Sequence, residues 1–228
     1  MARMGALLLL GGLWLVPPAA RCQEPTIAFA DDAVGDPDLH IWRTRFLKAL
    51  TQRDTVALFA ALNPRILNSF GGDCGIQEFK EQWQLTTAPE RSEVWELLIG
   101  LLRQGGRFVQ GGIFAAPFYT FAPVTPRLSP ELDGFETLVV IGEDVPVRAT
   151  PSLDGPVLAT LTLAVVQIDR QRDEVRDTAG RIWAPVVLIH AQAPGWIEQS
   201  MVRSPIGYRL GIGRRGDGWE IRSLVAGE

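Results

Sequence analysis

The sequence predicts an α+β protein, in which a mainly helical N-terminal domain is followed by a small β-barrel and a C-terminal β-hairpin. Three observations lead to this prediction. Apolar residues recur at helical spacing through the first half of the chain. A proline-rich stretch, APVTPRLSPELDG, follows that half. Beyond it, short runs rich in valine and isoleucine alternate with turn residues, a pattern that is typical of strands.

The chain begins with the features of a secretory signal peptide, which we predict over residues 1–22. Arg3 precedes an apolar run over residues 6–16, and this run is shorter than the roughly 20 residues that cross a bilayer. Cleavage after Ala20 and cleavage after Cys22 both fit the pattern. We therefore expect an exported protein without a transmembrane segment. A periplasmic location is favoured, and secretion is the alternative.

Residues 38–122 form the predicted helical domain, after a loose leader over residues 23–37. The helical segments are DLHIWRTRFLKAL, TVALFAAL, the stretch after Gly75 and SEVWELLIGLLRQGG. Asp54 and Ser92 are suited to cap two of these helices, and Gly105 is suited to end the last. RILNSF and IFAAPFYTFAPV are predicted to be extended.

A linker over residues 123–136 is predicted to separate this domain from the strands. Strand candidates then fill residues 137–203, at the short spacing of a small barrel or sandwich. The tail, residues 204–228, has two strand-like runs around RRGDG, which predicts a β-hairpin.

Several short motifs in residues 137–203 resemble the bacterial SH3 domain. They are Val147-Arg148, Pro151-Ser152, Pro156-Val157, Leu161, Trp183, Gly195-Trp196-Ile197 and Met201-Val202. The longer chain is also similar to a family of exported proteins that has no assigned activity. That likeness rests on Ser69-Phe70-Gly71-Gly72, Phe79, Trp83, Ser204-Pro205-Ile206, Tyr208-Arg209 and the run from Trp219 to Gly227. The first resemblance implies an SH3-like barrel. The second implies an architecture and no activity.

The composition argues against a nucleic-acid partner. The net charge is −4 and the pI is about 5.3. A protein that binds nucleic acid needs a basic stripe to displace counterions from the phosphates, and the sequence has none.

Cys74 is the one residue that suggests nucleophilic catalysis. Bacterial SH3 domains are often joined to papain-like endopeptidases, and GGDCG is similar to the nucleophile context of those enzymes. A catalytic thiolate needs a base within hydrogen-bonding reach. His40 precedes Cys74, and His190 lies in the barrel segment. We therefore predict that Cys74 is a small buried residue beside a turn. If cleavage follows Ala20, Cys22 remains in the mature chain and could form a disulfide with Cys74.

No metal or cofactor site is predicted. The histidines and cysteines have none of the spacings of metal-binding motifs. The carboxylates are dispersed, and no pair suggests a two-acid site. We accordingly expect no enzymatic activity, no catalytic residue and no cofactor.

Trp183 and Trp196 are the candidate ligand-binding residues, because SH3-type barrels present aromatic grooves that stack on peptides. The resulting hypothesis is an exported, non-catalytic binding module for cell-wall peptide or an envelope protein.

Two alternatives stay open. In the first, the helices and the tail form one cone-shaped α+β domain with the barrel inserted, which would be a small-molecule enzyme or a ligand-binding protein. This version predicts an enclosed pocket lined by Trp42, Phe46 and Phe79, with a buried carboxylate. In the second, the chain is a structural subunit that uses residues 114–121 as an interface.

Overall fold

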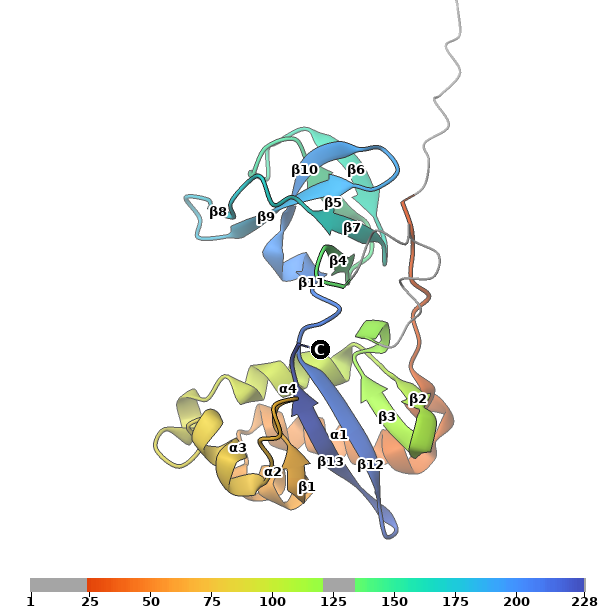
Figure 1. Cartoon of the computed structure of the whole chain (residues 1–228), viewed down its shortest axis with the longest axis vertical. Helices are drawn as coiled ribbons and strands as arrows, with labels where there is room; N and C mark the ends of the chain where they lie inside the picture. The colour runs from red at the N-terminus through yellow and green to blue at the C-terminus, as the bar shows by residue number, and fades with distance from the viewer. Residues whose placement is uncertain (1–23, 121–133, 228) are drawn as a thin grey trace, which may run out of the picture.

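The computed structural model describes residues 24–120 and 134–227. The predicted signal peptide, Cys22 and most of the predicted linker therefore lie outside the described residues. The chain forms two units that follow each other along the long axis of the molecule (Figure 1). The first unit contains a five-stranded sheet and the helices, and the second contains an eight-stranded sheet.

The first unit is built from segments at both ends of the chain. Its helices are α1 (Pro37–Thr51), α2 (Thr55–Ala61), α3 (Ile76–Gln82) and α4 (Val94–Arg103), with 3-10 turns η1 (Asp32–Gly35), η2 (Pro89–Arg91), η3 (Gln110–Gly112) and η4 (Phe118–Thr120). Its strands are β1 (Leu62–Leu67), β2 (Arg107–Val109), β3 (Ile113–Ala116), β12 (Arg209–Arg215) and β13 (Gly218–Val225). Asp36 and Asp54 cap α1 and α2 by accepting backbone N–H bonds, as expected for aspartate before a helix.

The tail hairpin lies at the centre of the first sheet. The strand order is β1-β13-β12-β3-β2, with β13 parallel to β1 and β12 antiparallel to β3. The prediction of a mainly helical N-terminal domain with a separate hairpin is therefore wrong. The described chain is mostly β, with four helices and two sheets. Residues 134–203 are inserted between β3 and β12.

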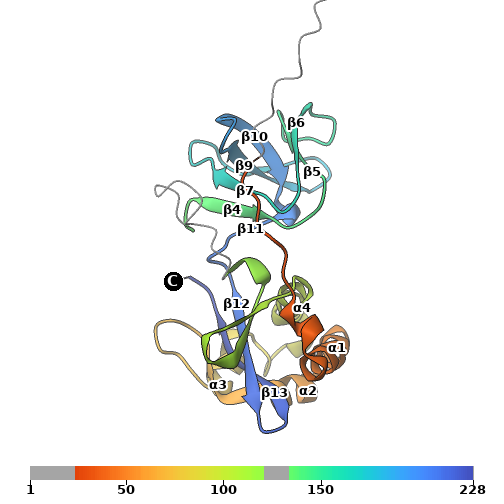
Figure 2. The same ribbon diagram turned by 90° about the vertical axis from the view of Figure 1, so that its right-hand side faces the viewer.

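A single core explains why the hairpin joins this unit. Helices α1 and α4 lie side by side over one face of the sheet (Figure 2). Their apolar faces bury Leu39, Trp95 and Leu98 against Ile212 of β12 and Ile221 of β13. Each isoleucine has an exposed fraction of 0%. Neither the helices nor the hairpin could bury these surfaces alone.

The second unit is a strongly curved sheet. Its strands are β4 (Thr137–Val140), β5 (Val145–Arg148), β6 (Val157–Leu161), β7 (Val165–Ile168), β8 (Val175–Arg176), β9 (Ile182–Leu188), β10 (Ala193–Glu198) and β11 (Val202–Arg203), with the 3-10 turn η5 (Gln199–Met201) before β11. The order is β11-β4-β7-β9-β10-β5-β6, and β8 pairs with β9. The sheet surrounds one core that includes Val140, Val147, Val186 and Ile197.

The predicted closed barrel is wrong. Within residues 134–227 no ladder joins the two end strands, β11 and β6, so the sheet stays open. Strand β6 pairs only with β5 and exposes Val157 and Leu158 at its free side. Strand β11 is only two residues long and pairs with β4. These edges are too short and too exposed to supply a closing ladder.

A third apolar cluster joins the two units. Successive strand residues point to opposite faces, so Val140 and Val166 enter the core of the second unit while Val139 and Val165 point outward. There Val139 and Val165 pack against Phe118, Tyr119 and Ile27. Residues 138–140 of β4 and 165–166 of β7 are therefore buried on both faces, which explains why apolar residues occupy consecutive positions there.

Residues 24–31, which we call the strap, cross from one unit to the other. The buried Glu24 carboxylate accepts hydrogen bonds from the backbone N–H groups of His190 and Ala191. Backbone bonds join Pro25 to Val165 and Ile27 to Leu163, each at 2.7 Å. At its other end the strap pairs with Gly106 in the first unit. The predicted loose leader is therefore held in place over this length.

Candidate functional site

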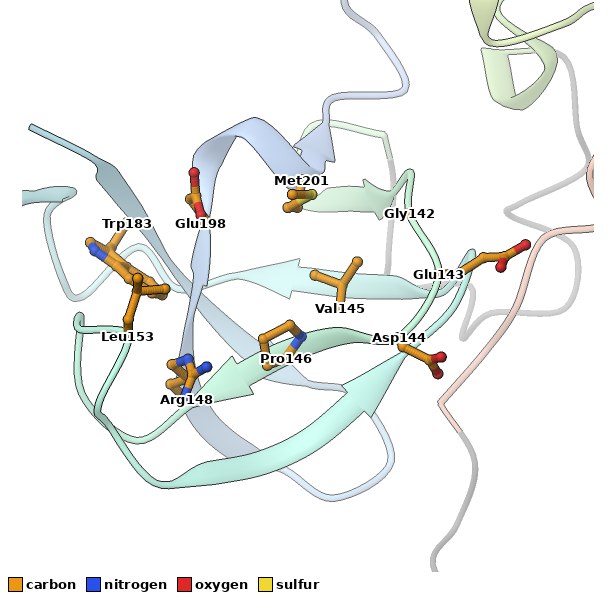
Figure 3. A pocket seen from close by; sticks show the side chains of 10 residues that line it. All are labelled: Gly142, Glu143, Asp144, Val145, Pro146, Arg148, Leu153, Trp183, Glu198 and Met201. Atoms are coloured by element: carbon orange, nitrogen blue, oxygen red, sulfur yellow. The ribbon is translucent and has the colours of Figure 1, made fainter.

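An open groove in the second unit is the strongest candidate for a binding site. It has a volume of about 180 Å³ and runs along β5, between the turn after β4 and the segment around η5 (Figure 3). Its lining residues are Gly142, Glu143, Asp144, Val145, Pro146, Arg148, Leu153, Trp183, Glu198 and Met201. Most of the surface inside the groove is apolar, although Glu143, Asp144, Arg148 and Glu198 also line it.

Tight turns present the exposed side chains of the groove. Leu153 lies at the tip of a turn closed by a bond from the Gly155 N–H to the Ser152 carbonyl. A Cβ at Gly155 would lie 2.5 Å from the Thr150 hydroxyl oxygen, so glycine is required there. The turn leaves Leu153 46% exposed. Met201, on the other wall, is 40% exposed.

The turn between β4 and β5 forms the acidic end of the groove. Asp144 has a φ of 51°, and its backbone N–H donates to the hydroxyl of Thr162 at 2.9 Å. Glu143 and Asp144 form no ion pair with any residue in the described ranges. Figure 3 places them at the end opposite Leu153 and Trp183. Glu198 is a further carboxylate of the groove, but Figure 3 places it near Trp183, away from this end, and it accepts a bond from Ser200.

Trp183 lines the groove but contributes little accessible surface. It is 1% exposed, and its indole N–H donates to Asp177 Oδ2 at 3.2 Å. Burial opposes ionisation of Asp177, but bonds from Trp183, from the backbone N–H groups of Arg181 and Ala179 and from the Arg181 side chain hold its pKa below the ordinary value. The indole is thus fixed in position, with one edge at the end of the groove.

Trp196 lies outside the lining of this groove. It is 9% exposed, and the guanidinium of Arg172 covers its ring at 4.6 Å from the centroid. Arg172 is itself held by Asp169 at 2.8 Å and by the carbonyl of Gly195 at 2.9 Å. An intramolecular cation therefore already occupies the face that a ligand would stack on.

The sequence interpretation missed the aliphatic and acidic residues of the groove. Leu153 is an apolar residue inside the turn motif PSLDG, and Glu143 and Asp144 are adjacent acids before a strand. Either feature signals an exposed side chain. Leu153 and the Glu143–Asp144 pair flank β5, and their place in one groove with Trp183 depends on the long-range pairing of β5 with β10, which the sequence pattern does not reveal.

The residues considered for catalysis lie apart. Cys74 is exposed in the loop after β1, contrary to the predicted burial, while His190 follows β9 in the second unit. His40 is on the exposed side of α1. Within the described ranges no group of three His, Cys, Asp or Glu residues is placed to hold a metal ion.

The cone-shaped alternative predicts an enclosed pocket lined by Trp42, Phe46 and Phe79. The structure does not bring these three residues together in one pocket. Phe46 and Phe79 are 5% and 1% exposed and belong to the core of the first unit. Trp42 is half-buried and lies with Phe46, Ala49, Ala57 and Trp219 on a groove of about 300 Å³, which is open rather than enclosed and does not include Phe79. The buried carboxylate of the unit, Glu220, pairs with Arg222 and accepts a bond from Asn63.

The fold and the groove define a two-unit protein in which a curved sheet is inserted into an α/β unit. No protein-family model, curated protein or solved structure matches this chain. Among the helices of residues 24–120 and 134–227, none is long and apolar enough to cross a membrane.

Proposed function

We propose that the protein is an exported, non-catalytic binding module that recognises cell-wall peptide or an envelope protein through the groove of its second unit. The observation that supports this most directly is the combination of exposed Leu153 and Met201 with carboxylates that have no cationic partner in the described chain. An extended peptide with an apolar side chain beside a basic group would match both features.

The sequence adds two supporting arguments. The motifs of residues 137–203 are similar to those of bacterial SH3 domains, which act in the cell envelope. The segment over residues 1–22 has the pattern of an export signal. We favour a periplasmic location, with secretion as the alternative, and we propose no enzymatic activity and no cofactor.

Binding to two defined probes tests this proposal. The first is purified peptidoglycan, measured by co-sedimentation. The second is a fluorescent peptide with leucine next to lysine, measured by polarisation. Leu153→Asp should weaken binding at least tenfold, because it places a charge in the aliphatic part of the groove. Val157→Asp is the matched control, since Val157 is 51% exposed in the same unit but lies outside the groove lining.

Charge reversal tests the acidic end. Glu143→Lys with Asp144→Lys should weaken binding of the lysine peptide and leave the fold intact, because both side chains lie in an exposed turn. Equal binding by wild type, Leu153→Asp and the double variant would contradict the proposal. If the wild-type protein bound neither peptidoglycan nor the peptide, the proposal would also be contradicted.

A small-molecule site in the first unit is the second candidate function. The open groove beside α1 contains Trp42 and Trp219, and small alanines leave its floor hollow. The inserted position of residues 134–203 also agrees with the cone-shaped alternative. Ala57→Leu would fill this groove, so loss of a small-molecule ligand in that variant alone would favour this function.

A further inference from the structure

Arg209, the first residue of β12, has a guanidinium whose hydrogen bonds are not satisfied. Its Nε and Nη2 atoms are buried and have no acceptor among residues 24–120 and 134–227. These two nitrogens form the side edge of the guanidinium. That edge is the one that matches two oxygens of a carboxylate or a phosphate in a bidentate pair.

Other arginines of the chain differ in this respect. Carboxylates hold Arg43, Arg172, Arg181 and Arg214 at 2.6 to 3.2 Å. Arg107 and Arg148 each have an unpaired Nε, but a terminal nitrogen of each donates to a carbonyl oxygen. Arg209 makes neither kind of bond to any residue of the described chain. The lack of a hydrogen-bond or ion-pair partner at Arg209 therefore distinguishes it from these six arginines.

The cost of this arrangement points to a missing anion. Burial disfavours the charged form and lowers the pKa of Arg209. A guanidinium nevertheless stays protonated in proteins, so the side chain remains a cation with unpaired donors. Buried donors without acceptors are rare and costly, and an unidentified ion or ligand is one common explanation.

Phe70 supplies the second half of the arrangement. Its ring lies 5.1 Å from the guanidinium carbon of Arg209, close enough for a cation–π contact. The ring is 55% exposed, although aromatic rings of this size are usually buried. Phe70 therefore covers the guanidinium on one side and faces solvent on the other. Tyr208, which precedes Arg209 in the chain, has its ring 5.4 Å from the ring of Trp83.

Hydrogen bonds close the loop that carries Phe70, and one of them joins the Gly71 N–H at its tip to the Ser69 hydroxyl at 3.1 Å. The hydroxyl of Ser69 donates to Asp73 at 2.8 Å, and the N–H of Asn68 donates to the Asp73 carbonyl at 2.8 Å. Gly71 and Gly72 follow Phe70, and Gly72 has a φ of 99°, which favours glycine.

We propose that Arg209 and Phe70 form a binding site for an oxyanion, a carboxylate or a phosphate group, with Arg209 holding two of its oxygens. Phe70 covers the face of the guanidinium and excludes water from the ion pair. The site lies in the first unit, away from the groove in the second unit. It therefore stands independently of the function proposed above.

Thermal unfolding of the mature chain with defined anions tests the site. Inorganic phosphate and acetate are added at constant ionic strength, with chloride as the reference anion. A ligand that binds only the folded state raises the Tm in a saturable way. We expect such a rise with at least one of the two oxyanions. The arm that responds identifies the group as phosphate or carboxylate, and titration calorimetry with the same anion gives the Kd.

Substitutions assign the effect to Arg209. Arg209→Met should abolish the oxyanion-dependent rise in Tm, and without added oxyanion it should be at least as stable as wild type. Phe70→Ala should raise the Kd severalfold. Arg45→Met is the matched control, because Arg45 is an exposed arginine without an ion pair in the described chain, and it should keep the full response.

Three results would overturn the proposal. The first is a Tm that responds equally to phosphate, acetate and chloride. The second is an unchanged oxyanion response in Arg209→Met. The third is a large loss of stability in that variant without added oxyanion, which would show that Arg209 is already paired within the chain. Arg209→Lys is the second variant: it keeps the charge but loses the Nε–Nη2 edge, so its Kd should rise at least tenfold, and an unchanged Kd would also count against the proposal.

Discussion

The two terminal nitrogens of Arg43 donate to the two carboxylate oxygens of Asp31, at 2.6 and 2.7 Å. Arg43 belongs to α1 and Asp31 is the last residue of the strap, so this ion pair fastens the strap to the first unit. Both side chains are largely buried, at 10% and 15% exposure. Because the strap also binds the second unit through Glu24 and Pro25, the pair contributes to holding the two units together.

Asp31→Ala should therefore destabilise the protein more than the loss of an ordinary ion pair would. The substitution leaves the Arg43 cation nearly buried without a partner, and breaking a buried pair costs about 3 kcal/mol. Urea unfolding followed by circular dichroism measures this loss. Arg43→Met combined with Asp31→Ala should recover part of the stability, because the unpaired charge is removed.

The control for this prediction is Asp38→Ala. Asp38 pairs with Arg214 but is 69% exposed, so its loss should change the free energy of unfolding by about 0.5 kcal/mol or less. Equal effects of the two aspartate substitutions would contradict a special role for the Asp31–Arg43 pair.

The bond between Trp183 and Asp177 should respond to acid. Hydrogen bonds hold the pKa of Asp177 below its ordinary value of 3.8. A carboxyl with a lowered pKa in the folded state stabilises the fold above its unfolded pKa, and this contribution is lost as the pH falls through the folded pKa. The indole N–H resonance of Trp183 in NMR spectra should therefore stay constant down to about pH 4 and shift below it.

Asp177→Asn provides the comparison for this titration. The amide cannot ionise, so the acid-dependent shift of the Trp183 resonance should disappear in that variant. A shift of the resonance near neutral pH in the wild type would contradict the assignment.

Much of the local structure follows from the sequence pattern. The cap predicted at Asp54 is confirmed for α2, whereas α4 begins after Glu93 rather than directly after the predicted cap Ser92. The partner of the tail hairpin could not be predicted in the same way, because β12 and β13 pair with β3 and β1 across the inserted segment. Long-range pairing of this kind leaves no periodic signal in either segment.

The candidate site shows the same limit. Trp183 was identified from its motif, and the structure places it at the groove, yet burial leaves it little surface for a ligand. The sequence pattern around a tryptophan in a strand is the same whether the side chain is buried or exposed. Phe70 and Arg209 were each visible as parts of separate motifs, but their contact depends on the loop after β1 reaching β12.

Tyr119 should make the stability sensitive to alkali. Burial between the units raises its pKa well above the ordinary 10.0, and the charge of Arg203 only partly opposes this effect. A group with a raised pKa stabilises the fold fully below its unfolded pKa, and the contribution is lost as the pH rises beyond about 10. The free energy of unfolding should therefore fall as the pH rises above about 10.

Tyr119→Phe isolates this contribution. Phenylalanine keeps the ring in the cluster with Ile27 and Val165 but cannot ionise, so the variant should lose less stability in alkali than the wild type. The difference between the ultraviolet absorbance titrations of the two proteins reports the Tyr119 phenol alone. Its ionisation near pH 10 in the folded wild type would contradict the burial argument.

Ile221 tests whether the tail hairpin is the centre of the first unit. Ile221 has an exposed fraction of 0% and packs in the core beneath α1. Ile221→Ala removes buried methylene groups and leaves a cavity, so it should cost about 3 kcal/mol in urea unfolding. Val56→Ala is the control, because Val56 is 78% exposed on α2 and its truncation should cost less than about 0.5 kcal/mol. If the hairpin were a separate appendage, Ile221→Ala would be as mild as the control, and NMR spectra of the two variants would show no changes in α1 or α4.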